Sequence, residues 1–364
     1  MKIGILTFHW ATNYGAILQA YALQEYLTRL GHIVYIIDYK PRRYDFTWKS
    51  ILKHPRNLLY LRKSVCRILK EKKLTEFRKK YLHMTDRYYR QYDLSTIVKE
   101  FDVLVSGSDQ VLNPYYTMMG EGDTTSVYYL DFPDAKCVKF GYALSFGCVR
   151  YPEEAAVYAS RFIRHFDRIS VRENSGADIV RQLKYPGDSV LVPDPTILEG
   201  SRLFDRLDLP SREIGTPYVC VYMLRRSLPY RVENALYIDD VHRTYSMEEW
   251  LSLIRGAETL VTNSYHGMIM AILFRVPFIV ELEDGDSAGM NDRFVTLLKK
   301  LGLEYRINRG NSISRLMMAD DIDWESVSTT ICPNAAGMKK LMKALRDEMT
   351  LRQDVGGTPY FLSC

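Results

Sequence analysis

The sequence Asn-Ser-Tyr-His-Gly at residues 263–267 holds the histidine with the clearest setting for acid–base chemistry. Leu260 and Val261 before it are typical of the end of a buried strand, and the apolar run Met268–Phe274 is typical of a buried helix. His266 is therefore predicted at a strand-to-helix turn, beside the first N–H groups and the positive dipole end of the helix. Such a turn is a ready anion site, although a histidine there is also often a structural residue.

Two more side chains that could take part in catalysis or ligand binding follow predicted buried strands. Asp109 comes after the strand pattern of residues 101–107, and Arg172 comes after that of residues 168–171. Open α/β sheets bind ligands at the carboxyl ends of their strands. Asp109 can hydrogen-bond sugar hydroxyls or accept a proton, although an aspartate after a strand is also an ordinary helix N-cap. Arg172 can hold a carboxylate or a phosphate with its forked guanidinium.

The first forty residues predict a strand, a helix and a second strand that form one βαβ unit with a parallel sheet. The strands are expected at Ile3–Phe8 and Val34–Ile37, and the helix at Ala16–Leu30, ended by Gly31. The turn at residues 13–15 lies at the ligand-binding edge. Its glycine spacing is not that of a dinucleotide fingerprint, so a bound dinucleotide is only weakly indicated.

Positive charge is concentrated between Lys40 and Arg90, where 17 Lys and Arg residues stand against four Asp and Glu residues. Apolar residues at helical spacing predict one or two amphipathic helices with cationic faces. Two interpretations stay open: a solvated helical face, or attraction to an anionic lipid surface or a polyanionic acceptor. Nucleic acid is a poorer partner, because no recognised binding motif accompanies the charge.

The composition is that of a globular protein: of 364 residues, 47% are hydrophobic and 26% charged. The six cysteines form no C-x-x-C pair, so we expect reduced thiols, no zinc or other metal, and a cytoplasmic location. The first residues are too short an apolar stretch for a signal peptide. The longest apolar run, 268–280, is interrupted by Arg275 and Pro277 and is too short to span a bilayer.

The length predicts two α/β domains that face a cleft. Residues 1–200 are expected to form an N-terminal Rossmann-like domain, with the basic helical insertion at 40–90. Pro193 and Pro195 predict an extended crossing rather than a regular element. Residues 210–335 are expected to form a second Rossmann-like domain, and residues 336–364 a C-terminal helix and tail that cross back to the first.

Five separated segments stand in order over residues 1–305. They are Thr12–Ala20, Ser106–Gln110 with Asn113 and Pro114, Ser170–Glu173, Asp194–Thr196 and Asn263–Gly267. Together they resemble the polysaccharide pyruvyl transferase family. Each segment is weakly specific alone, and their order and spacing make the resemblance strong. The resemblance implies a GT-B-like fold and the transfer of pyruvate from phosphoenolpyruvate to two sugar hydroxyls, as a ketal, on a polysaccharide or a lipid-linked glycan precursor. It implies no cofactor beyond this donor substrate.

The resemblance also implies roles for individual residues. His266 is expected to act as the general acid or to contact the phosphate, Arg172 to hold the carboxylate or phosphate, and Asp109 to orient the acceptor or act as a base. The donor site is expected to include these cations and their neighbours, namely Arg172, Ser264, His266, Gly267, Arg225, Arg226 and Arg293. The acceptor site is expected to include Asn13, Tyr14, Gly15, Ser108 and Asp109.

The chain departs from the family pattern in two places. Many members have an arginine where this chain has Ser264, so another cation must replace it, with Arg225, Arg226 or Arg293 as the candidates. The stretch between Met223 and Ser246 is also short for a full strand–helix–strand unit, so we expect a shortened second domain.

Two other functions remain open from the sequence. A GT-B glycosyltransferase that uses a nucleotide sugar shares the fold and a metal-free cleft, and fold alone does not separate the two enzymes. A catalytically silent glycan-binding relative is the other alternative, because a shortened second domain fits an incomplete donor pocket. For the transferase we expect a sugar or lipid-linked glycan as the acceptor. Residues 40–90 are the candidate contact with an anionic inner membrane face.

Overall fold

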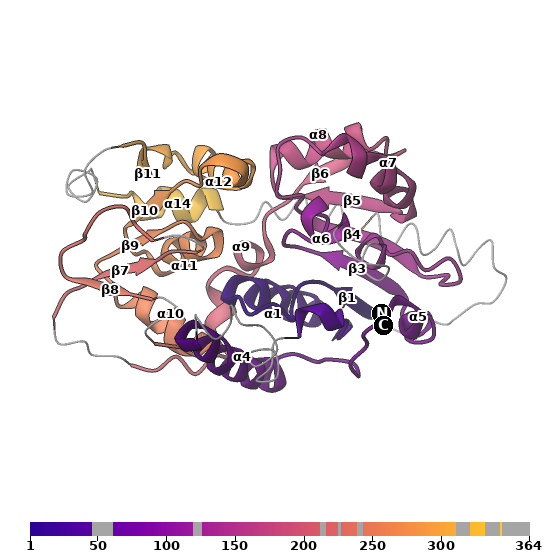
Figure 1. Cartoon of the computed structure of the whole chain (residues 1–364), viewed down its shortest axis with the longest axis horizontal. Coiled ribbons are helices and arrows are strands. Elements are labelled where there is room, and N and C mark those ends of the chain that lie inside the picture. The colour runs from indigo at the N-terminus through magenta and orange to yellow at the C-terminus, as the bar shows by residue number, and fades with distance from the viewer. Residues whose placement is uncertain are drawn as a thin grey trace.

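The computed structural model describes residues 1–45, 61–118, 126–211, 216–224, 227–238, 243–310, 321–331 and 343. Its first sheet has six parallel strands in the order β2-β1-β3-β4-β5-β6 (Figure 1). The strands are β1 (Lys2–Leu6), β2 (Ile33–Ile36), β3 (Val103–Gly107), β4 (Val138–Leu144), β5 (Arg168–Val171) and β6 (Ser189–Leu191). The helices of this half are α1 (Tyr14–Arg29), α4 (Leu61–Tyr81), α5 (Gln91–Leu94), α6 (Pro114–Met118), α7 (Glu153–Phe162) and α8 (Asn174–Gln182).

The second sheet has five parallel strands in the order β11-β10-β9-β7-β8. The strands are β7 (Val219–Tyr222), β8 (Ala235–Tyr237), β9 (Thr259–Thr262), β10 (Phe278–Glu281) and β11 (Ile307–Asn308). The helices of this half are α10 (Met247–Arg255), α11 (Tyr265–Phe274), α12 (Asp292–Leu301) and α14 (Trp324–Ile331). The predicted α/β fold with two Rossmann-like parallel sheets is therefore confirmed.

One hydrophobic cluster joins the two halves. It runs from Ile3 and Ile5 of the first sheet through α1, α11 and the short helix α9 (Pro195–Glu199) to Leu260 and Phe278 of the second sheet. Figure 1 shows α1, α9 and α11 between the two sheets. Because they share this core, the halves are held in one orientation, and residues on opposite sides of the junction can form a single site.

The segment after β6 corrects one prediction. We expected an extended crossing at residues 193–196, but Pro195 is the first residue of α9, and Asp194 caps that helix by accepting a hydrogen bond from the Thr196 N–H. Proline is favoured at the first helical position because its missing N–H needs no partner there. The aspartate before it supplies the capping oxygen.

The connection between β7 and β8 is short, as expected. Among residues 223–234, the part that the structure describes contains no helix, and β8 still pairs with β7 in parallel. The next helix, α10, begins only after Ser246, whose side chain and that of Glu249 form a reciprocal capping box. The second half is therefore shortened on this side of its sheet.

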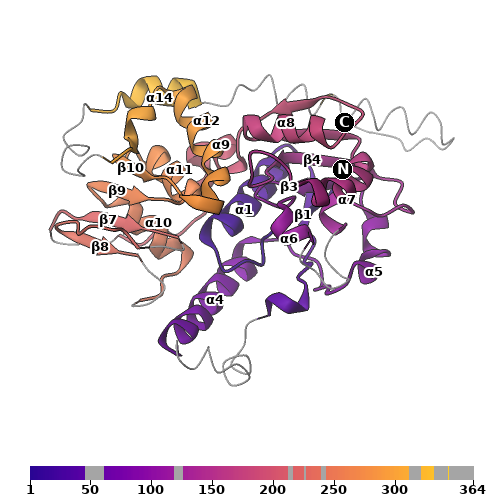
Figure 2. The same ribbon diagram turned by 45° about the horizontal axis from the view of Figure 1, so that its top comes forward.

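Helix α4 accounts for part of the basic segment 40–90, while residues 46–60 lie outside the described residues. Figures 1 and 2 both show α4 beside α1 and α10. Several of its cations bind groups outside the helix: Lys73 pairs with Glu249 of α10 at 2.9 Å, and the buried Arg78 donates to the backbone carbonyl of His9 at 2.7 Å. Part of the positive charge therefore fastens α4 to the rest of the molecule.

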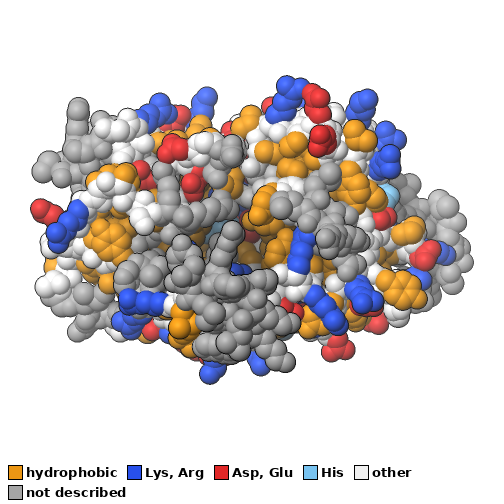
Figure 3. Space-filling model, viewed as in Figure 1, with side chains coloured by type: hydrophobic (Ala, Val, Ile, Leu, Met, Phe, Trp, Pro, Cys, Tyr) orange, Lys and Arg blue, Asp and Glu red, His pale blue; other side chains and the backbone are white. Residues whose placement is uncertain are grey.

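Figure 3 shows Lys and Arg side chains scattered over both halves of one face, on the part of it that the structure describes. None of the described helices is both long enough and apolar enough to cross a bilayer. The predicted C-terminal helix and tail, 336–364, lie outside the described residues apart from Lys343.

Candidate active site

His266 lies at the predicted strand-to-helix turn. β9 ends at Thr262, Ser264 caps α11 by accepting a hydrogen bond from the N–H of Gly267 at 3.1 Å, and His266 is the second residue of the helix. The cap fixes the first turn of α11, so the imidazole stands at the positive end of the helix dipole. His266 is 6% exposed, and its Nε2 has no hydrogen-bond partner among the described residues.

Arg172 follows β5 and its side chain is fully buried. Its guanidinium faces three carboxylates: Asp194 at 2.7 Å, Glu173 at 3.4 Å and Asp109 at 3.5 Å. It also lies over the ring of Tyr265, at 5.1 Å from the ring centre. The structure thus places Arg172 within a network of protein charges, so its first role is to hold this network together.

Asp194 joins the two halves of the site. Its Oδ2 accepts hydrogen bonds from Arg172 Nη1 at 2.7 Å and from Ser108 Oγ at 3.1 Å, and lies 3.5 Å from Nε2 of His266. Burial alone would raise the pKa of Asp194, but the charges of His266 and Arg172 bring it well below its usual range. Asp194 is therefore a carboxylate that can orient the His266 ring.

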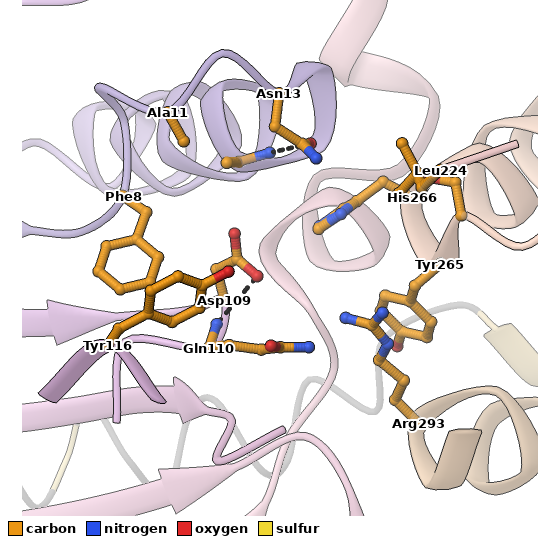
Figure 4. Close-up of a pocket in the computed structure, with 12 residues that line it drawn as sticks. Phe8, Ala11, Asn13, Asp109, Gln110, Tyr116, Leu224, Tyr265, His266 and Arg293 are labelled. Atoms are coloured by element: carbon orange, nitrogen blue, oxygen red, sulfur yellow. Dashed lines mark hydrogen bonds between the residues drawn. The ribbon is translucent and has the colours of Figure 1, made fainter. Parts of the chain in front are cut away.

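A cavity of about 140 Å³ opens between the halves at this point (Figure 4). It lies beyond the carboxyl ends of β1 and β3, where the strand order of the first sheet reverses, and beyond β7 and β9, where that of the second reverses. These are the switch points at which doubly wound sheets bind ligands. The described lining residues are Phe8, Ala11, Asn13, Ala16, Asp109, Gln110, Tyr116, Leu224, Ser264, Tyr265, His266 and Arg293.

Arg293, near the start of α12, brings positive charge to the cavity wall. Figure 4 shows its guanidinium beside Tyr265, on the wall opposite Asp109. Burial and the neighbouring Arg172 lower the pKa of Arg293 to about 10, and its Nε has no hydrogen-bond partner among the described residues. A cation held in this way is stabilised by an anionic ligand, which restores the interactions that it loses on burial.

Asp109 faces the cavity from the first half of the molecule. Its backbone has a φ of 67°, in the left-handed region, and its Oδ1 accepts a hydrogen bond from the Gln110 N–H. The alternative of an ordinary helix N-cap is therefore wrong, because the next helix, α6, begins only at Pro114. A non-glycine residue in this conformation costs on the order of 1 kcal/mol and is often found at functional sites.

The other predicted acceptor residues have different surroundings. Asn13 lines the cavity and caps α1 through Ala16, but Tyr14 points into the junction, where its ring stacks on Trp250 and its hydroxyl donates to the carbonyl of Tyr245. Ser108 is buried against Asp194. Neither Tyr14 nor Ser108 is among the described residues that line the cavity.

Gly15 allows the His266 ring to reach its position. A Cβ atom at Gly15 would lie 2.2 Å from Nδ1 of His266, closer than real side chains permit. The two residues come from opposite halves, since Gly15 belongs to α1 and His266 to α11. Gly15, a predicted acceptor residue, therefore leaves the space that the histidine ring fills.

The predicted donor residues are brought together only in part. Ser264, His266 and Arg293 line the cavity, while the Gly267 N–H is used in the helix cap. Arg225 and Arg226 lie outside the described residues. Many family members carry an arginine at the position of Ser264. Of the three arginines expected to replace it, Arg293 is the one that lies at the cavity among the described residues.

Sequence reasoning missed Asp194 and Tyr265 as site residues. Asp194 begins one of the five family segments, but it was given no role, and the extended interpretation of the neighbouring prolines concealed the helix cap. The ring of Tyr265 contacts two guanidinium groups, those of Arg172 and Arg293, at 5.1 Å and 5.4 Å from its centre. An aspartate followed by proline is a signal for a helix start that could have identified the first.

The fold and site define a protein of the GT-B type, with two Rossmann-like domains and a cavity between them. Solved structures of this type are similar over the whole chain. The S. aureus MnaA structure solved with UDP has a TM-score of 0.55 at 8% identity, covering 100% of both chains. UDP-GlcNAc 2-epimerase from Methanocaldococcus jannaschii has a TM-score of 0.51 at 10% identity, covering 95% of this chain and 100% of its own. At such identities the similarity shows the fold alone.

The family is shown by a different comparison. The family model described as polysaccharide pyruvyl transferase matches residues 13–281, a range that contains Asn13, Asp109, Arg172, Asp194 and His266. The chain therefore belongs to the polysaccharide pyruvyl transferase family. No curated protein matches the chain.

Proposed function

We propose that the protein transfers pyruvate from phosphoenolpyruvate to two hydroxyls of a sugar and releases phosphate. The observation that carries this proposal is the small cavity into which both halves direct positive charge. His266 and Arg293 come from the second half, and the N-terminus of α1 comes from the first. Phosphoenolpyruvate carries a carboxylate and a phosphate on three carbons, so it needs convergent positive groups of this kind.

The size of the cavity also favours a small donor. Its volume of about 140 Å³ is below the roughly 300 Å³ at which pockets for larger ligands begin. UDP is bound in the similar S. aureus MnaA structure, which keeps a nucleotide sugar as the second candidate. The cluster of charges around a small hollow argues for phosphoenolpyruvate over that candidate.

The proposed reaction begins with proton transfer to the methylene carbon of phosphoenolpyruvate. His266 gives the proton, and the double bond becomes a methyl group next to an oxocarbenium-like carbon. One sugar hydroxyl adds to this carbon and loses its proton to a base, for which Asp109 is the candidate. The carbon–phosphate oxygen bond then breaks, a second hydroxyl adds, and the ketal and inorganic phosphate are formed. Of the two hydroxyl protons, one replaces the proton given to the methyl group and the other leaves with phosphate.

The residues beneath the cavity have positioning roles in this scheme. Asp194 holds the His266 ring, and Arg172 holds Asp194 and Asp109. Burial raises the pKa of the neighbouring Glu173, whereas Arg172 opposes that change. The positive charge of Arg172 thus keeps several carboxylates close together beside an anion site.

The test is phosphate release from phosphoenolpyruvate with a panel of galactose-, mannose- and glucosamine-type glycans. We expect one acceptor class to stimulate release and to gain a pyruvate ketal, detected by mass spectrometry. The same panel is offered with UDP-sugars in place of phosphoenolpyruvate. Sugar transfer from a UDP-sugar without any requirement for phosphoenolpyruvate would instead identify a glycosyltransferase. Glycan binding without phosphate release would identify the silent relative.

A further inference from the structure

A second cavity, of about 350 Å³, adjoins the candidate active site. The two cavities share the side chains of Phe8, Ala11, Asn13 and Tyr116 as a common wall. The larger cavity is otherwise lined, among the described residues, by Trp10, Thr12, Tyr44, Lys63 and Arg67. It belongs to the first half of the molecule, on the side of the small cavity that Asp109 occupies.

Stacking and hydrogen bonds hold the aromatic residues of the larger cavity in place. Trp10 stacks on Tyr44 with ring centres 4.5 Å apart and planes 29° apart, and its Nε1 donates to the hydroxyl of Tyr128 at 3.0 Å. Arg43 donates to the carbonyl of Tyr116 and to the hydroxyl of Tyr44. Tyr44 is half-buried, with the guanidinium of Arg43 over its ring at 4.7 Å, and Trp10 is 8% exposed. The two fixed rings give the cavity a rigid aromatic wall at little cost in conformational entropy.

Two cations also line the larger cavity. Lys63 and Arg67 are four residues apart on α4, so they extend from the same face of the helix. Both side chains are exposed. A pair of cations on one helix face is suited to the several oxygens of a phosphate or diphosphate group.

Helix α4 holds in place the turn at residues 9–12, which lies between the two cavities. Buried Arg78 donates to the carbonyls of His9 and Ala11, and Glu71 accepts a hydrogen bond from Thr12 at 2.7 Å. The helix that carries the two cations therefore also positions the wall of the candidate active site. A ligand that lies along the larger cavity has a defined direction toward Asp109 and His266.

We propose that the larger cavity is the acceptor subsite and that it takes a sugar bearing a phosphate or diphosphate at its reducing end. The sugar packs against the wall formed by Trp10 and Tyr44, and the phosphate lies at Lys63 and Arg67. The two hydroxyls to be bridged then point across the shared wall. This inference rests on the proposed function. A free sugar phosphate, a nucleotide-linked sugar and a prenyl diphosphate-linked sugar all supply the same chemistry.

Direct binding without phosphoenolpyruvate tests the subsite. Calorimetric titrations would use galactose, mannose and N-acetylglucosamine in four forms: the 1-phosphate, the UDP-sugar, the farnesyl diphosphate-linked sugar and the methyl glycoside. We expect at least one phosphorylated form to bind more tightly than the methyl glycoside of the same sugar. The preferred form distinguishes the three sources. Equal affinity for phosphorylated and neutral forms, or no binding of any phosphorylated form, would overturn the proposal.

Variants test the residues. In the Lys63→Ala/Arg67→Ala double variant, the Kd of the preferred phosphorylated form should rise about tenfold, and that of the methyl glycoside should not change. Arg62→Ala is the matched control, because Arg62 is an exposed cation on the same helix and is not among the described lining residues. An equal loss in the control would show a general charge effect and contradict the subsite. Tyr44→Ala should weaken both forms, while Tyr44→Phe should preserve binding.

The outcomes separate the subsite from the proposed reaction. If phosphorylated sugars bind through Lys63 and Arg67 but phosphoenolpyruvate releases no phosphate, the subsite stands and the proposed reaction fails. If phosphate is released and the double variant leaves the KM of the acceptor unchanged, the reaction stands and the subsite fails. The KM of phosphoenolpyruvate should stay unchanged in the double variant, because the donor cavity does not include either cation among its described lining residues.

Discussion

Arg172 and His266, from opposite halves of the chain, approach the same oxygen atom, Oδ2 of Asp194, at 2.7 Å and 3.5 Å. A carboxylate from the first half therefore orients the imidazole of the second. Because this carboxylate also caps α9, which packs between the halves, the position of the His266 ring depends on the packing of the whole junction. The geometry of the site and the stability of the fold should thus respond to the same substitution.

Asp194→Asn tests this connection. The variant leaves the buried guanidinium of Arg172 without its closest carboxylate, so we expect the free energy of unfolding to fall by about 3 kcal/mol. Turnover should fall as well, because the ring of His266 loses its charged partner. Urea unfolding and phosphate release measure the two effects. Ser108→Ala is a milder comparison, since it removes one hydrogen bond to the same oxygen and should cost about 1 kcal/mol.

The effect of Asp194 on stability should depend on pH. Its pKa lies well below the usual value in the folded protein, whereas the unfolded chain has the ordinary value of about 3.9. The stabilisation is therefore complete above about pH 4 and is lost as the pH falls below that value toward the folded pKa. The difference in unfolding free energy between the native protein and Asp194→Asn should be constant from pH 6 to 8 and shrink below about pH 4. A difference that grows on acidification would contradict the assignment.

Gly15→Ala should displace the His266 ring. The new Cβ would lie 2.2 Å from Nδ1, and a shift of about 1 Å in a catalytic group can cost on the order of 100-fold in rate. We expect a loss of this size in kcat with little change in far-ultraviolet circular dichroism. Gly256→Ala, in which the new Cβ would lie 3.1 Å from the Tyr218 hydroxyl and not at the cavity, should keep full activity. Normal turnover in Gly15→Ala would show that the ring position is unimportant.

Arg293→Met separates binding from stability. The pKa of Arg293 is lowered to about 10, so its charged form is less stable in the unliganded fold than in water. Replacing it by methionine should leave the unfolding free energy nearly unchanged, because its contacts with the rings of Tyr265 and Phe294 can be filled by the new side chain. The KM of phosphoenolpyruvate should rise at least about tenfold. A large loss of stability with unchanged KM would assign Arg293 a purely structural role.

Tyr14→Phe tests whether Tyr14 binds the acceptor. Its hydroxyl donates to the carbonyl of Tyr245 at 2.8 Å, and its ring stacks on Trp250 at 4.9 Å. We therefore expect a loss of about 1 kcal/mol in stability and no change in the KM of the acceptor. A higher acceptor KM, with the unfolding free energy unchanged, would restore the acceptor role that the sequence predicted.

The local parts of the site could be predicted from the sequence, because they depend on neighbouring residues. The turn that carries His266 is fixed by an apolar strand, a serine cap and an apolar helix, all within about 15 residues, and the structure has each of them. The βαβ unit at the N-terminus is local in the same sense. Its helix begins at Tyr14, two residues before the predicted start, since Asn13 is the cap.

The long-range parts could not be predicted. Whether Arg172 binds a ligand or a protein carboxylate depends on Asp194 and Glu173 around it, and on a ring, Tyr265, from the other half. Tyr14 has the same difficulty, because the Trp250 that covers it lies far along the chain. Sequence patterns identify which elements form, and the packing between halves decides which side chains remain at the cavity.

The most direct test of the proposed reaction is phosphate release from phosphoenolpyruvate, measured with and without the glycan acceptor in the native protein and in His266→Ala. We expect acceptor-dependent release in the native protein and a loss of about 100-fold or more in the variant, with a cooperative urea unfolding transition retained. Acceptor-dependent release at the native rate in His266→Ala would contradict the proposed reaction.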